Sequence, residues 1–239
     1  MYLFAPLERH YDKGFGAMGD SFQDAATVLK NQHNRGNLNG HLPICYLFRH
    51  SIELFLKGAI IIVHQGLRIS YGEEPCTSEP KISDGKKLKS IYAIHDINTL
   101  YKYLSRLVLE KKAEIFEVTE SSWEFDDDID SKIKRLTEID PLSSYFRYPT
   151  NKITTFENEK SAFKETSVEA VMALAKKNNE PMKTIKAMLA PGQDTQIFIH
   201  DDSFTEEAMS LLSEVAEYIS TYHFYLMRTF AGDGLDKNN

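Results

Sequence analysis

The charged side chains whose spacing is best suited to binding or catalysis lie in an otherwise apolar stretch between residues 42 and 63. Arg49, Glu53 and Lys57 follow one another at intervals of four residues, and His50 comes directly after Arg49. On a helix this spacing places the four side chains on one stripe, with opposite charges side by side. The stripe has two interpretations, which do not exclude each other. It is an ion-pair ladder that allows a buried helix to carry charge, or the lining of a cleft that binds a phosphate or nucleotide.

Helices must position this stripe, and the apolar periodicity of the chain predicts an all-α fold. The expected core helices span about 20–33, 43–65, 96–113, 126–139 and 204–230. We expect a single helical domain over 1–239, a bundle of about four to five core helices. Loop or helical insertions are expected at about 66–92 and 150–200. In and around the second insertion, 162–177 and 182–189 are expected to be helical, and 196–200 is the one strand candidate.

Capping residues mark the expected helix starts. The expected caps are Asp20 or Ser21, Asp96, and Ser203 in a capping box with Glu206. Three aspartates at 126–128 precede another helix, and we interpret them as capping groups in preference to a metal site. His95 directly precedes Asp96, and we expect its ring to hydrogen-bond to the backbone or to an acidic neighbour.

The charge balance narrows the classes of partner. The formal net charge is -7, which argues against a broad surface for duplex DNA. Residues 42–110 nevertheless carry more Lys and Arg than Asp and Glu, so a local anion-binding cleft remains compatible with the sequence. Charged residues interrupt the apolar stretch at 42–63, which predicts a buried helix and no membrane span. The N-terminal residues lack a secretory pattern, and Cys45 and Cys76 lie in dissimilar surroundings, so a cytoplasmic protein is expected.

Most cofactor and metal motifs have no counterpart in this sequence. It contains no phosphate-binding glycine loop, no dinucleotide-binding glycine triplet, no paired-cysteine motif and no nucleophile elbow. The eight histidines show no metal-type spacing on one helix face. We therefore expect no metal and no cofactor.

Three short stretches together resemble HEPN domains. The first is Tyr46-Leu47-Phe48-Arg49-His50-Ser51-Ile52-Glu53-Leu54-Phe55-Leu56-Lys57-Gly58-Ala59, which is similar to the Glu-x-x-x-Lys-Ala core of the long HEPN helix. The second is Ile94-His95-Asp96-Ile97-Asn98-Thr99-Leu100, similar to the His-Asp-Leu that opens the next helix, and the third is Phe146-Arg147-Tyr148-Pro149 before the last helix. Their order and separation carry the resemblance, which covers residues between about 46 and 149.

The resemblance implies a helical bundle, commonly dimeric, from prokaryotic toxin–antitoxin or phage-defence systems. Its expected partner is a second copy of the chain or a protein encoded by a neighbouring gene. Active family members cleave RNA without a metal and use an arginine followed, after four to six residues, by a histidine. Imidazole handles protons at the 2′-hydroxyl or leaving oxygen, and guanidinium binds the phosphate. Arg35 and His41 have this spacing, but they precede the long helix, whereas the family motif lies near the last helix. No histidine follows Arg147 at the required interval.

Three functions are therefore carried forward. The leading hypothesis is a module that binds a nucleotide, RNA or a partner chain without the usual nuclease motif. Its binding residues would be Arg49, His50, Glu53, Lys57, His95, Asp96, Arg147 and Tyr148. Arg147 is expected to be either a buried anchor that pairs with Glu53 or a cation facing the ligand. The alternatives are a metal-independent endoribonuclease, using Arg35 and His41 or else Arg49 or Arg147 with His50 or His95, and a structural scaffold subunit without a small ligand.

Overall fold

The structure is a computed structural model that describes residues 5–33, 39–83, 87–141, 143–148, 159–177, 187–190 and 196–232. Most of these residues are helical, which confirms the expected all-α bundle. The helices are α1 (Phe15–Gln32), α2 (His41–Gly66), α3 (Ile97–Glu110), α4 (Lys112–Thr119), α5 (Asp127–Ile139), α6 (Val168–Lys177) and α7 (Ser203–Ala231). Two short 3-10 helices span Leu7–Arg9 and Ile91–Ala93. No helix in the described ranges is long and apolar enough to cross a membrane.

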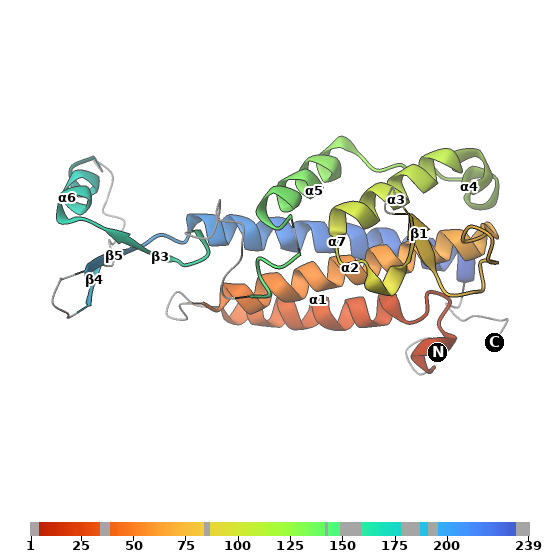
Figure 1. Cartoon of the computed structure of the whole chain (residues 1–239), viewed down its shortest axis with the longest axis horizontal. Helices are drawn as coiled ribbons and strands as arrows, with labels where there is room; N and C mark the ends of the chain where they lie inside the picture. Colours follow the sequence, from red (N-terminus) through yellow and green to blue (C-terminus); the bar gives the residue numbers. More distant parts are fainter. Residues whose placement is uncertain are drawn as a thin grey trace.

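Three long helices form the centre of the bundle, with α1 and α7 packed along α2 (Figure 1). Glycines permit close contact, since Gly58 faces the ring of His223 and Gly66 faces the ring of Phe230. The second contact lies further toward the C-terminus than the first on both helices, so α2 and α7 run parallel. Helix α2 is buried over nearly its whole length, because α1 and α7 flank it and α3 packs on a further side.

Helices α3 and α5 cover the remaining apolar surface of α2 and α7 (Figure 1). Their buried residues recur at helical spacing, with Leu100, Leu104 and Leu107 on α3 and Ile129, Ile133 and Leu136 on α5. Each of the two helices therefore has one apolar face toward the core and one polar face toward solvent. This packing brings the N-terminal end of α3 and the C-terminal end of α5 next to the middle of α2.

Two small antiparallel sheets accompany the helices. Strands β1 (Lys81–Ser83) and β2 (Leu88–Ser90) pair beside the bundle. Strands β3 (Phe163–Thr166), β4 (Ala187–Ala190) and β5 (Gln196–His200) form a sheet in the order β3-β5-β4. This second sheet and α6 project from one end of the bundle (Figure 1).

Two of the expected helix caps are wrong. Helix α1 begins at Phe15, because the Asp12 carboxylate accepts hydrogen bonds from the backbone N–H groups of Gly14 and Gly16. Asp20 and Ser21 therefore lie within the helix and do not cap it. At α7, Ser203 is already helical and its hydroxyl donates to Asp201 over 2.7 Å, so the expected capping box does not form.

The other two expected caps are confirmed. The Asp96 carboxylate accepts from the backbone N–H groups of Asn98 and Thr99 at the start of α3. The Asp126 carboxylate accepts from the N–H of Ile129 at the start of α5, as the capping interpretation of the three aspartates requires.

The expectations for the two insertions are partly wrong. Residues 163–166 form β3 in place of the first turn of an expected helix, and α6 begins only at Val168. Residues 187–189 belong to β4, where a helix was expected, and 178–186 lie outside the described residues. The expected loop at 66–92 contains β1 and β2. The strand expected at 196–200 is confirmed as β5.

Candidate functional site

The polar stripe of α2 converges on the carboxylate of Glu53, whose side chain is only 1% exposed. Oε1 accepts hydrogen bonds from Lys57 Nζ at 2.8 Å and from His95 Nδ1 at 2.9 Å. Oε2 accepts from Arg49 Nη1 at 3.0 Å, and His50 Nδ1 lies 3.9 Å from the same oxygen. Four of the predicted binding residues therefore surround the fifth.

Arg49 connects this cluster to two other segments. Its Nε donates to Asp140 Oδ2 over 2.9 Å, and its Nη2 donates to the backbone carbonyl of His95. The other oxygen of Asp140 accepts from the backbone N–H groups of Ser144 and Tyr145 at 2.7 and 2.9 Å. One guanidinium thus ties α2 to the segment before α3 and to the C-terminal end of α5.

The charges of this cluster balance. Burial raises the pKa of Glu53, but the nearby His50 imidazole, the charge and hydrogen bond of Lys57, and the hydrogen bond from His95 lower it by more. The pKa of Glu53 therefore lies well below its ordinary value, and the carboxylate is ionised at neutral pH. Arg49 and Lys57 supply two positive charges against the two negative charges of Glu53 and Asp140. The ion-pair ladder interpretation therefore describes the buried part of the stripe.

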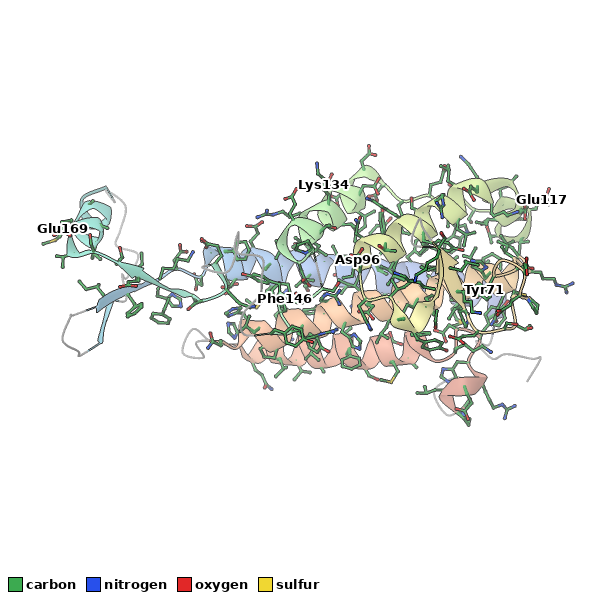
Figure 2. All side chains as sticks on the ribbon, in the orientation of Figure 1. Tyr71, Asp96, Glu117, Lys134, Phe146 and Glu169 are labelled. Carbon is green, nitrogen blue, oxygen red and sulfur yellow. The ribbon has the colours of Figure 1, made fainter. Side chains whose placement is uncertain are left out.

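One cavity that borders the cluster is too small for a nucleotide. A cavity lined by Arg49, Asp96, Asp140 and Phe146 holds only about 10 Å³, far less than the several hundred Å³ of a nucleotide-sized site. Asp96 and Phe146 mark this part of the bundle in Figure 2. This cavity therefore has no room for a nucleotide.

Part of the stripe reaches the protein surface. The His95 side chain is 49% exposed although its Nδ1 is held by the buried Glu53. His50 is partly exposed and stacks nearly parallel to the ring of Tyr46, with centroids 5.9 Å apart. The guanidinium of Arg147 lies 5.9 Å from the centre of the same Tyr46 ring and is exposed. We call Tyr46, His50, His95 and Arg147 the histidine surface.

The remaining predicted site residues have separate places. Arg147 does not anchor Glu53, because that position is occupied by Arg49 and His95; its guanidinium faces outward beside Tyr46. Tyr148 is exposed next to it. Asp96 caps α3 with both carboxylate oxygens and belongs to the scaffold of the histidine surface.

The structure describes only one member of the expected catalytic pair, His41. His41 is buried at the start of α2, where its Nε2 donates to the backbone carbonyl of Lys160 over 2.9 Å. Burial lowers the pKa of His41, which favours a neutral ring with a structural hydrogen bond. Arg35 lies outside the described residues.

Two buried acidic residues were missed at the sequence level. One is Asp140, the partner of Arg49. A carboxylate at a helix C-terminus is unfavourable, and this position was the available signal for a nearby cation. The other is Asp12, which accepts from His223 Nε2 over 2.9 Å from 211 residues away. No local pattern indicates a contact over that separation.

The described residues bring together no group of three or more His, Cys, Asp or Glu side chains able to hold a metal ion. In comparisons with protein-family models, curated proteins and solved structures, this chain has no match.

Proposed function

We propose that this chain is a HEPN-like helical module that binds RNA through the histidine surface, within a prokaryotic defence or toxin–antitoxin-type system. The observation that supports RNA binding most directly is the Glu53–His95 pair. The buried carboxylate fixes the half-exposed imidazole by its Nδ1 at 2.9 Å and leaves Nε2 for an external partner. The assignment to the HEPN family rests on the motifs at 46–59, 94–100 and 146–149.

The other members of the histidine surface suit a nucleic-acid ligand. Arg147 is an exposed cation that can donate two parallel hydrogen bonds to a phosphate. Tyr46 and Tyr148 offer aromatic rings beside it, and unpaired bases stack on such rings. Arg49 and Lys57 do not touch the ligand in this proposal, since both are buried and paired. They hold Glu53 and thereby orient His95.

The test measures binding of a fluorescently labelled single-stranded RNA by anisotropy. We expect Arg147→Ala to weaken binding by on the order of tenfold, the usual effect of one charge-assisted hydrogen bond. Arg106→Ala is the matched control, because Arg106 is also exposed but lies on α3 with Glu110 as its partner. RNA binding that is equally strong in the wild type and in Arg147→Ala would contradict the proposal.

A second candidate function, a metal-independent endoribonuclease, is favoured by one specific arrangement. Two imidazoles, of His50 and His95, approach opposite oxygens of Glu53. One histidine can accept the proton of a ribose 2′-hydroxyl while another protonates the leaving 5′-oxygen, and Arg147 can bind the phosphate. The products would be a 2′,3′-cyclic phosphate and a free 5′-hydroxyl.

Cleavage is tested with RNA in the presence of EDTA, beside a substrate with 2′-deoxyribose at every position. The all-deoxy substrate should stay intact, and His50→Ala and His95→Ala should each abolish cleavage. His200→Ala, on the projecting strand β5, is the control that should keep full activity. Absence of EDTA-resistant cleavage at any protein concentration would exclude the ribonuclease and leave the binding proposal standing.

A further inference from the structure

A cavity of about 540 Å³ lies between α7 and the segment that joins α4 to α5. Four aromatic side chains line it, namely Trp123, Tyr218, Tyr222 and Tyr225. It shares no residue with the histidine surface. Its volume is that of a site for a small ligand or a single long side chain.

The aromatic walls are fixed by their own contacts. The rings of Trp123 and Tyr222 are perpendicular, with centroids 5.5 Å apart. The Tyr222 hydroxyl donates to the Trp123 carbonyl over 2.8 Å, and Trp123 Nε1 donates to Thr119 Oγ1 over 2.9 Å. Phe125 stacks on Tyr222 at 4.5 Å. Two adjoining walls are thus pre-organised before any ligand binds.

The charge of the cavity is negative. Glu124, Glu214 and Glu217 line it, and within the part of the chain that the structure describes no Lys, Arg or His does so. Lysines outside the lining pair with two of them, Lys112 with Glu124 at 2.8 Å and Lys132 with Glu214 at 3.1 Å. No cationic side chain in the described ranges pairs with Glu217.

We propose that this cavity binds an organic cation, an alkylammonium or guanidinium group. Aromatic faces attract such cations through the ring quadrupole, and the effect grows when the cation is partly desolvated. The Glu217 carboxylate, which no lysine neutralises in the described ranges, adds Coulomb attraction for a cation and repels anionic ligands. The cation can come from a free polyamine or from a lysine or arginine side chain of a partner protein, since both present the same group.

A second cavity adjoins the first. Its lining allows the two sources of the cation, a free polyamine and a side chain of a partner protein, to be distinguished. It has about 490 Å³, shares Ser122, Trp123 and Glu124 with the first, and is otherwise lined mainly by apolar residues including Leu109, Ile115 and Phe116. A basic side chain followed by an apolar one can occupy both cavities at once. A free polyamine can use only the acidic one well, so we expect a peptide to bind more tightly.

Trp123 provides the measurement, because it is the one tryptophan of the chain. Its emission is followed while the protein is titrated with spermidine, with an acetylated and amidated Lys-Leu dipeptide, and with NaCl at matched ionic strength. Both amines should give a saturable change that NaCl does not. Tighter binding of the dipeptide identifies a side chain as the source, and tighter binding of spermidine identifies a polyamine. No saturable change beyond the NaCl control would overturn the proposal.

Two substitutions localise the binding. Glu217→Gln should weaken cation affinity by on the order of fivefold, and Tyr225→Leu should weaken it by removing one ring. Glu207→Gln is the matched control, since Glu207 is an exposed residue of the same helix that pairs with Arg135 away from the cavity. Far-UV circular dichroism verifies that all three variants are folded. Equal affinity of Glu217→Gln and Glu207→Gln for the amines would overturn the assignment to this cavity.

Discussion

Arg49 Nε donates to Asp140 Oδ2 over 2.9 Å and so joins the middle of α2 to the end of α5, 91 residues further along the chain. The same guanidinium bonds Glu53 and the carbonyl of His95. Three segments of the bundle therefore share one buried cation. Its loss would leave two buried carboxylates with fewer partners, which is far more costly than the loss of a surface ion pair.

We expect Arg49→Met to lower the free energy of unfolding by about 3–5 kcal/mol, because methionine keeps much of the volume but leaves Glu53 and Asp140 undercompensated. Urea unfolding followed by circular dichroism measures the change. Arg106→Met removes an ion pair that is more than half exposed and should leave the free energy almost unchanged. Similar losses in the two variants would mean that burial of the Arg49 network adds nothing to stability.

Stability should fall in acid through the two buried carboxylates Glu53 and Asp12. Burial raises both pKa values, but the donors around each carboxylate lower them by more, so both lie below their ordinary values of 4.5 and 3.8. The unfolded chain therefore takes up protons first as the pH falls. Their contribution is complete above about pH 5 and is lost progressively below pH 4.5.

Urea unfolding at a series of pH values from 7 to 3 checks this expectation. Asp12→Asn removes one of the two groups, and the free energy of this variant should depend less steeply on pH below 4. A free energy of unfolding that stays constant or rises as the pH falls from 5 to 3 would contradict the assignment of depressed pKa values.

The sequence predicted well those elements that are specified by residues close together in the chain. The apolar periodicity gave α2, α3 and α5 to within a few residues. The apolar periodicity did not predict element boundaries that depend on contacts with residues distant in the sequence. Helix α1 begins at Phe15 because Asp12 holds two backbone N–H groups, and Asp12 is itself held by His223 of α7. Residues 163–166 have helix-compatible side chains but pair as β3 with β5, whose sequence comes more than thirty residues later.

The candidate site likewise combines features that local spacing predicts with contacts between distant residues. The spacing of Arg49, Glu53 and Lys57 predicted that they share one stripe, and an acidic neighbour was one of the two kinds of partner expected for His95, beside the backbone. The sequence did not show that Asp140 would complete the network. It also left two places open for Arg147, and the structure puts this residue outside. Pairings across 91 residues depend on how helices pack, which periodicity within one helix does not specify.

Gly58 should be intolerant of a side chain because it faces His223. A Cβ at this position would lie 2.8 Å from His223 Nε2, the atom that donates to Asp12. We expect Gly58→Ala to destabilise the protein by about 1–3 kcal/mol, although alanine favours helix more than glycine does. Thermal or urea unfolding measures it.

A double-mutant cycle provides the control for this prediction. In a His223→Ala background the imidazole is absent, so Gly58→Ala should no longer be costly and can gain the helix preference of alanine. If Gly58→Ala costs the same in both backgrounds, contact with His223 is not the reason for glycine at this position.

The projecting sheet and α6 should be removable without loss of the bundle. Ala162 and Asp201 are joined by a backbone hydrogen bond of 2.8 Å at the point where the chain leaves and re-enters, and β3 and β5 continue this pairing antiparallel. Two opposed strand residues can be connected by a two-residue Asn-Gly turn.

We expect a chain with 163–200 replaced by Asn-Gly to unfold in one cooperative urea transition and to keep the RNA affinity of the full chain. The backbone carbonyl of Lys160 still accepts a hydrogen bond from His41 in that chain, so the start of α2 keeps its partner. A broad, non-cooperative transition would show that the projecting part stabilises the bundle, and a weakened RNA affinity with intact cooperativity would place RNA contacts on it.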